Sequence, residues 1–281
     1  MKKQLCLNQF WIRLIATITM VIDHIALFMA MFGFIETTSL AYVILRIIGR
    51  LSFPLFATMI VEGVYRTRHI SYYLFRLGGC AIGLGLVYLI LESFEFHIAI
   101  PSNLFLTLFL GAVVAYFIKR KGIYTLFAIL LVGLSFVPHF VVVPNYLNPD
   151  YASYGLVLFA LLSVAHLLAD KKSKDIAFEA LEPYSNYQEA PDYQRNINIG
   201  YCVALIIVNV LYYLVTTLIP SFNIRIAMTL QDYSMLAIFI IFMYNGKRGY
   251  DSDGYRIFNY LFYPVHIAIP VSYTHLTLPT I

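Results

Sequence analysis

The run FWIRLIATITMVIDHIALFMAMFGF, residues Phe10–Phe34, decides the fold class. The hydrocarbon core of a bilayer is roughly 30 Å thick and each helical residue advances about 1.5 Å, so ~20 apolar residues cross it. The run is long enough, and it lacks the period-two alternation of a membrane β-strand. The sequence therefore predicts a transmembrane helix here.

The same apolar character recurs along the chain. Of the 281 residues 60% are hydrophobic and 12% are charged, and the mean hydropathy is +0.77. No soluble core absorbs so much apolar sequence, and one cleavable signal peptide does not explain stretches that recur to the far end. An all-α polytopic membrane protein with about nine spans is predicted, at Phe10–Phe34, Leu40–Tyr65, Tyr72–Leu91, Ser102–Ile118, Ile123–Val143, Tyr154–Ala169, Ile197–Ile219, Arg225–Tyr244 and Ile257–Val271.

Loop charges predict the orientation of these spans, because cytoplasmic loops carry the excess of Lys and Arg. Five basic clusters fall on one side of the predicted membrane: Lys2–Lys3, Arg66 with Arg68, Lys119–Lys121, Lys171–Lys174 and Lys247–Arg248. The other side carries mostly acidic residues, with Arg225 as the exception. We expect the N-terminus in the cytoplasm and the C-terminus outside. The net charge of +4 follows from such loops and gives no reason to expect a nucleic-acid partner.

Residues 1–270 are expected to form a single transmembrane domain. The polar stretch Asp170–Asn196 has too little apolar content for a domain and is predicted to be a cytoplasmic linker. The last apolar run, Ile257–Pro270, is too short to span a bilayer. Because the string Val-Ser-Tyr-Thr-His-Leu that follows also resembles a translated adapter from DNA library preparation, residues 271–281 are expected to be a non-native tail.

Two adjacent ionisable residues, Asp23 and His24, lie near the middle of the first predicted span. Such groups are costly at membrane depth and are therefore functional candidates. Histidine is the side chain whose ordinary pKa suits a general base near neutral pH, and Asp23 would orient His24 only indirectly, since adjacent helix positions point about 100° apart. The alternative is a polar pair satisfied by neighbouring helices.

Arginines accompany this pair. Arg13 precedes His24 by eleven positions, almost three turns, so the two share a helix face about 16 Å apart. This spacing suits a long donor whose anionic end meets Arg13 while its reactive end reaches His24; a snorkelling arginine is the alternative. Arg46 and Arg50 are four apart and repel each other unless an anion lies nearby. That anion is either the phosphate of a donor or Asp23.

Other ionisable residues give weaker signals. Glu62 and Arg66 are four apart, which predicts a salt bridge, and His166 is expected to have a surface or packing role. His266, two residues after Pro264, is a second histidine at predicted membrane depth and a further catalytic candidate. The three cysteines lie far apart without Cys-x-x-Cys spacing, so neither a metal nor a disulfide is expected.

Several spaced blocks of sequence carry a resemblance to a known family. They are Ile22-Asp23-His24, Arg46-Ile-Ile-Gly-Arg-Leu-Ser-Phe-Pro-Leu-Phe, Val61-Glu62-Gly63, Thr67-Arg68, Tyr73, Arg76-Leu77, Tyr244-Asn245-Gly246-Lys247-Arg248-Gly249 and Phe262-Tyr263-Pro264-Val265-His266. Together they resemble the TraX family of conjugative-transfer membrane proteins, whose best-known member acetylates the N-terminus of F-type pilin. The resemblance implies an acetyl-CoA donor and a membrane-associated acceptor.

The TraX family is also similar to integral-membrane acyltransferases that modify surface sugars. These carry a basic residue and a histidine eleven positions apart on the first helix, a spacing that Arg13 and His24 match. The resemblance implies that Arg13 contacts coenzyme A phosphates and that His24 acts at the transfer centre.

The sequence thus predicts a membrane-embedded acyltransferase in a bacterial cell membrane. It would move an acetyl group from acetyl-CoA to an amine or hydroxyl of a membrane-associated protein or a surface glycan. The candidate catalytic residues are His24, Asp23 and His266, and the candidate donor-binding residues are Arg13, Arg46 and Arg50. A membrane transporter and a noncatalytic assembly subunit of a secretion or conjugation system remain as alternatives.

Overall fold

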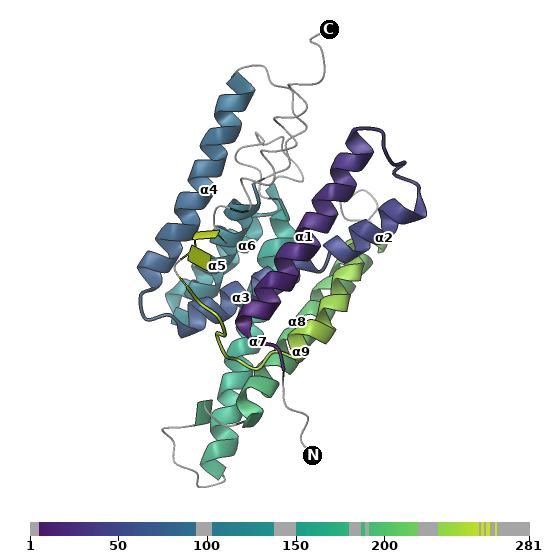
Figure 1. Ribbon diagram of the computed structural model, residues 1–281. Helices are drawn as coiled ribbons and strands as arrows, with labels where there is room; N and C mark the ends of the chain where they lie inside the picture. Colours follow the sequence, from purple (N-terminus) through teal and green to yellow (C-terminus); the bar gives the residue numbers. More distant parts are fainter. Residues whose placement is uncertain are drawn as a thin grey trace.

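The computed structural model describes residues 6–93, 103–137, 150–179, 187–188, 191–218, 230–252, 254–255, 257–258 and 262 (Figure 1). This part of the chain forms helices and no strand, which confirms the all-α prediction. The helices are α1 (Gln9–Met31), α2 (Leu40–Gly49), α3 (Ser52–Arg66), α4 (Ile70–Ser93), α5 (Leu104–Arg120), α6 (Ile123–Leu134), α7 (Ala152–Glu179), α8 (Pro191–Leu218), the 3-10 helix η4 (Gln231–Leu236) and α9 (Ala237–Phe242).

Several helices are long and apolar enough to cross a membrane. Among the described residues they are five: Gln9–Met31, Leu40–Arg66, Ile70–Ile90, Ala152–Glu179 and Asp192–Leu218. Ile123–Leu134 and Gln231–Phe242 are apolar but shorter. Many large apolar side chains on α4, α6 and α8 are exposed, as lipid-facing helices require. These helices indicate association with a bilayer, while the predicted count of nine is not reached within the described segments.

The second span bends where α2 gives way to α3. Arg50 and Leu51 form a turn between the two helices. Pro54 explains the break, because proline has no N–H to donate to the carbonyl of Arg50 and its ring crowds that carbonyl. The proline thus accounts for the turn that divides the span into α2 and α3.

Helix α3 lies at the centre of the bundle, where it contacts α1, α5, α7 and α9. Most of its residues are buried. Its end is held by Lys119 of α5, whose Nζ donates to the carbonyl oxygens of Val64 and Tyr65 across 2.8 and 3.0 Å. A lysine at this position satisfies carbonyls that have no partner within the helix.

The stretch 170–196, predicted to be a linker, is helical at both ends. Helix α7 continues to Glu179 and α8 begins at Pro191, and the two extend together beyond the rest of the bundle (Figure 1). The hydroxyls of Tyr187 and Tyr193 both donate to Asp170. These bonds across the hairpin add to the good helix propensity of the lysine- and alanine-containing segment.

A loop after α9, residues 244–249, pairs with the segment that leads into α1. The backbone N–H of Asn245 donates to Leu7, and those of Gln9 and Phe10 donate to Lys247 and Arg248, at 2.8, 2.8 and 3.1 Å. Two glycines with positive φ, at positions 246 and 249, permit its course. We call this segment the 244–249 loop.

Candidate functional site

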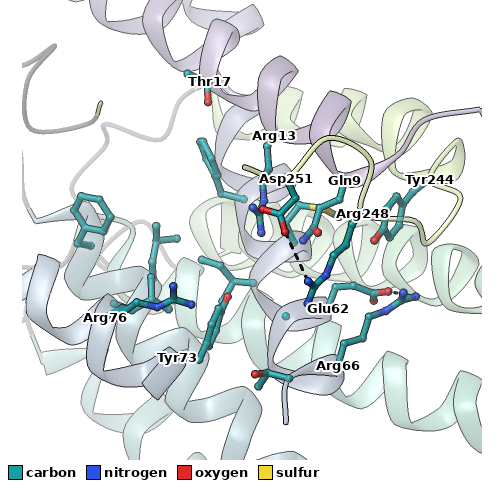
Figure 2. Close-up of a pocket in the computed structure, with 18 of the residues that line it drawn as sticks. Gln9, Arg13, Thr17, Glu62, Arg66, Tyr73, Arg76, Tyr244, Arg248 and Asp251 are labelled. Carbon is teal, nitrogen blue, oxygen red and sulfur yellow. Dashed lines mark ion pairs between the residues drawn. The ribbon is translucent and has the colours of Figure 1, made fainter. Parts of the chain in front are cut away.

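A cavity of about 400 Å³ lies among α1, α3, α4, α5 and the 244–249 loop (Figure 2). Four arginines from four different elements line it: Arg13 of α1, Arg66 of α3, Arg76 of α4 and Arg248 of the loop. Two carboxylates, Glu62 and Asp251, also line it, and each is paired with one of these arginines. The lining therefore has an excess of positive charge.

Polar and apolar lining residues separate along the helices. The arginines lie near the start of α1, the end of α3 and the start of α4, at the end of the bundle that carries the basic loops. Away from these arginines on α1 and α3, and on the first turns of α5, the lining is apolar, with Met20, Met59 and Phe105 among its members. A cavity with a cationic part and an apolar part suits an amphiphilic anion.

Arg13 belongs to a row of cavity residues on one face of α1, in which Gln9 precedes it and Thr17 and Met20 follow at helical spacing. His24 is the next position of that face, one turn beyond Met20, but it is not among the residues that line the cavity. Within the described residues Arg13 makes no ion pair or side-chain hydrogen bond. It is thus a cation available to a ligand. His24 is half-buried, with its ring 6.4 Å from that of Phe28.

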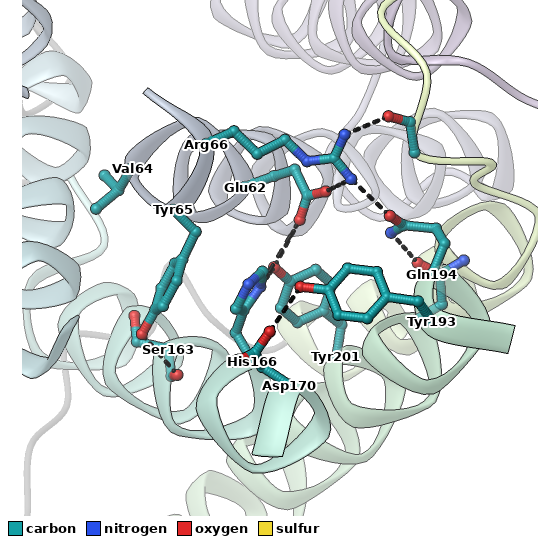
Figure 3. A network of polar contacts seen from close by, with 12 residues as sticks. Glu62, Val64, Tyr65, Arg66, Ser163, His166, Asp170, Tyr193, Gln194 and Tyr201 are labelled. Atoms are coloured by element: carbon teal, nitrogen blue, oxygen red, sulfur yellow. Dashed lines mark hydrogen bonds and ion pairs between the residues drawn. The ribbon is translucent and has the colours of Figure 1, made fainter. Parts of the chain in front are cut away.

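A buried polar network lies directly behind the cavity (Figure 3). The carboxylate of Glu62, 1% exposed, lies 2.6 Å from Nη2 of Arg66, so the predicted salt bridge is present. The hydroxyl of Tyr201 donates to the other oxygen of Glu62 across 3.0 Å. This hydroxyl also lies 2.6 Å from Nδ1 of His166. Burying a carboxylate at this depth requires such partners.

His166 belongs to this network as a packing residue. It is 4% exposed, and its ring stacks on that of Tyr65 with 3.9 Å between centroids. Tyr65 in turn donates to the carbonyl of Ser163. The packing role expected for His166 agrees with this position.

Asp23 and Arg46 form an ion pair between α1 and α2. Nη1 of Arg46 donates to Oδ2 of Asp23 across 2.6 Å, and both side chains are largely buried. Gly49 permits the contact, because a Cβ there would overlap the carboxylate of Asp23. Of the two anions considered for Arg46, Asp23 is thus the one beside it.

Arg50 is separated from the cavity. It is 6% exposed, and its Nη1 approaches Oε1 of Gln231 in η4 at 3.4 Å. Its Nε and the amide nitrogen of Gln231 are buried without a hydrogen-bond partner. Of the three arginines predicted to hold a donor, the cavity contains only Arg13.

The family model described as "TraX protein" matches residues 9–182, which is more than half of the chain and covers α1 to α7. The chain belongs to the TraX protein family. It is also similar to a protein of Dichelobacter nodosus described as "Probable fimbrial assembly protein FimC, serogroup H1". The two are 27% identical over 278 residues, 96% of each chain. No solved structure matches.

The TraX-matching region contains Arg13, Glu62, Arg66 and Arg76, while Arg248 lies beyond its end. His266, most of the predicted span Ile257–Val271 and the tail 271–281 lie outside the described residues. Among the residues that the structure does describe, no cluster of three or more His, Cys, Asp or Glu side chains could hold a metal ion.

Sequence reasoning missed most of the network behind the cavity. Gln194 and Asn198 are four apart at the start of α8, and Gln194 donates to Asn198 across 2.9 Å. Such a pair of amides in a long apolar helix is a sequence signal of a shared polar contact. No comparable signal points to Tyr201, because it is one of 23 tyrosines in the chain and tyrosine is common in membrane proteins.

Proposed function

We propose that this TraX-family protein is a membrane-embedded acyltransferase that moves an acetyl group from acetyl-CoA to an acceptor at the membrane. The observation that carries the proposal is the cavity, whose lining has a cationic part and an apolar part. Coenzyme A has the matching chemistry, since its phosphates are anionic and its pantetheine arm is long and nearly neutral.

Arg13, Arg76 and Arg248 are the proposed partners of the donor phosphates. Arginine suits this role because its planar guanidinium forms paired hydrogen bonds with phosphate oxygens. Arg13 supports the assignment most directly, because it makes no ion pair within the described segments. From Arg13 the pantetheine arm would follow the face of α1 past Thr17 and Met20, over about 16 Å, to His24.

His24 is the proposed general base. It removes a proton from an acceptor amine or hydroxyl as that group attacks the thioester carbonyl. A C–N or C–O bond forms, the C–S bond breaks, and the proton passes to the departing sulfur, which leaves as the thiol of coenzyme A. Holding both reactants on one helix face supplies the proximity that the reaction needs. His266 remains a candidate for the same role.

Asp23, Arg46 and Arg50 are proposed to support the site without touching the donor. The Asp23–Arg46 ion pair fixes α1 against α2, and with it the helix that carries both Arg13 and His24. Arg50 lies one helical turn after Arg46, next to Gln231.

The acceptor is proposed to be a pilin-like protein or a surface glycan at a bacterial cell membrane. The Dichelobacter nodosus relative is named for fimbrial assembly, which favours a pilin-like protein. We further propose nine spans with the N-terminus in the cytoplasm, because the basic loops alternate with acidic ones. The arginines of the cavity would then lie toward the cytoplasm, where acetyl-CoA is found.

A noncatalytic assembly subunit is the second candidate, and the name of the relative is the observation in its favour. A transporter is a third, since buried Arg, Asp and Glu residues also line solute paths. Mass spectrometry of membrane proteins and envelope glycans, from cells with and without the protein, separates the acyltransferase from both alternatives. We expect an acetyl mass increment that depends on the protein. If no acceptor changes mass but pilus assembly fails in cells without the protein, the protein is a noncatalytic assembly subunit.

A further inference from the structure

The 244–249 loop carries Arg248 into the wall of the cavity, although the loop is not part of a helix. Backbone carbonyls in such a segment need partners from elsewhere. The backbone N–H groups of Gln9 and Phe10 supply those of Lys247 and Arg248, and two side chains supply those of Gly246 and Tyr244. Nη1 of Arg66 donates to the carbonyl of Gly246 across 2.5 Å, and Nδ2 of Asn198 donates to that of Tyr244 across 2.7 Å.

Arg66 is itself held in place by acceptors on two helices. Its Nη2 donates to Oε1 of Gln194 across 2.7 Å and lies 2.6 Å from Oε1 of Glu62 (Figure 3). Both terminal nitrogens of Arg66 are therefore engaged by protein oxygens. A ligand phosphate would have to displace the carboxylate of a nearly fully buried glutamate to take their place.

Arg248 is in the opposite situation. Its side chain is 74% exposed, and its ion pair with Asp251 is long, at 3.6 Å. Exposed pairs of this kind contribute little and are readily exchanged. Of the two arginines, Arg248 is the one that an incoming anion can engage.

The contact between the loop and Arg66 also requires a residue without a side chain at position 246. Gly246 has a φ of +74°, and a Cβ added there would lie 2.5 Å from Oε1 of Gln194 and 3.0 Å from Nη2 of Arg66. Only glycine fits this conformation and this close approach. The glycine at position 246 thus allows the loop to contact Arg66.

We infer that Arg66 is a positioning residue, which holds the 244–249 loop through Gly246 so that Arg248 meets the phosphate end of the donor. The inference rests on the proposed function in one respect, namely that the donor bears phosphates. It assigns a share of the affinity for phosphate to Arg248, beside Arg13 and Arg76, and the placement of Arg248 to Arg66.

The test uses the full chain in lipid nanodiscs, with coenzyme A as the probe and calorimetry as the measurement. We expect Arg248→Gln to weaken binding about tenfold or more, the usual effect of losing a charged hydrogen bond. Arg66→Lys keeps the charge but loses the planar fork, and should weaken binding to a similar degree. The double variant should bind no more weakly than Arg248→Gln alone, because both changes remove the same interaction.

Trypsin cleavage provides a readout that needs no donor. Cleavage after Lys247 and Arg248 should be several-fold faster in Arg66→Lys than in the wild type, while cleavage at the lysines of α7 should not change. Gly246→Ala disturbs the same contact from the loop side and should reproduce both effects if Arg66→Lys fails to fold. Gly79→Ala is the matched control, because a Cβ at Gly79 meets nothing within 4 Å.

The outcomes are distinct. If the losses of affinity in the double variant are additive, Arg66 binds the donor directly. If coenzyme A binding and trypsin cleavage are unchanged in Arg66→Lys and Gly246→Ala, Arg66 does not position the loop. Either result overturns the inference. If the wild type does not bind coenzyme A, the proposed donor is wrong. Loop cleavage then still decides whether Arg66 holds the loop.

Discussion

The guanidinium of Arg46 donates to the carboxylate of Asp23 across 2.6 Å and joins the first two helices inside the bundle. Both side chains are largely buried, at 13% and 15% exposure. Removing one member of a buried ion pair leaves the other charge unpaired, which typically costs about 3–5 kcal/mol. We therefore expect Asp23→Asn and Arg46→Gln each to lower the thermal midpoint clearly, and the double variant to lose less than the sum.

Thermal unfolding of the purified protein in detergent checks this prediction. Arg120→Gln serves as the control, since Arg120 is exposed and donates to Tyr116 four residues away on the same helix. Single variants as stable as the wild type would show that the ion pair contributes nothing.

The close approach of Gly49 to Asp23 gives a second prediction. A Cβ at position 49 would overlap Asp23, so Gly49→Ala should push α1 and α2 apart and destabilise the protein by about as much as an overpacked core substitution, ~1–3 kcal/mol. Gly83→Ala is the matched control, because nothing lies within 4 Å of a Cβ there and alanine favours a helix. Equal thermal midpoints for the two variants would contradict the tight α1–α2 contact.

The affinity for the donor should depend on an arginine of the cavity and not on one outside it. Arg13→Gln should weaken coenzyme A binding about tenfold or more, since a charged hydrogen bond contributes roughly 1.5–3 kcal/mol. Arg50→Gln should leave the affinity unchanged, because Arg50 lies next to Gln231 and not in the cavity. Calorimetry in nanodiscs measures both. A large loss for Arg50→Gln with none for Arg13→Gln would place the donor elsewhere.

The sequence predicted features that depend on spacing along one helix. The all-α class, the Glu62–Arg66 salt bridge and the shared face of Arg13 and His24 all follow from apolar content or helical periodicity. The family resemblance was likewise confirmed by the match over residues 9–182.

Features that depend on packing between helices escaped sequence reasoning. Arg46 and Arg50 keep helical spacing, since the backbone N–H of Arg50 donates to the carbonyl of Arg46. The spacing alone does not tell that Arg46 donates to Asp23 while Arg50 approaches Gln231 of η4, because those contacts depend on how the helices pack. The 244–249 loop is nearly 180 residues from Arg66 in sequence, so their contact at Gly246 follows only from the assembled bundle. The helical ends of the polar linker were not predicted, because its composition does not reveal the bonds of Tyr187 and Tyr193 to Asp170.

The most direct test of the proposed acyl transfer is turnover per folded molecule in His24→Gln. The assay follows labelled acetyl groups from acetyl-CoA to the envelope fraction of cells that lack the protein, with monodispersity and the thermal midpoint as measures of folding. His69→Gln, the same substitution at an exposed loop position, is the control, and His266→Gln is made alongside. Because general acid–base groups typically contribute ~100- to 10,000-fold, we expect His24→Gln to lose most turnover while remaining folded, and His69→Gln to keep it. Near-normal turnover in folded His24→Gln would contradict the account, and its loss in His266→Gln would move the transfer centre to the last predicted span.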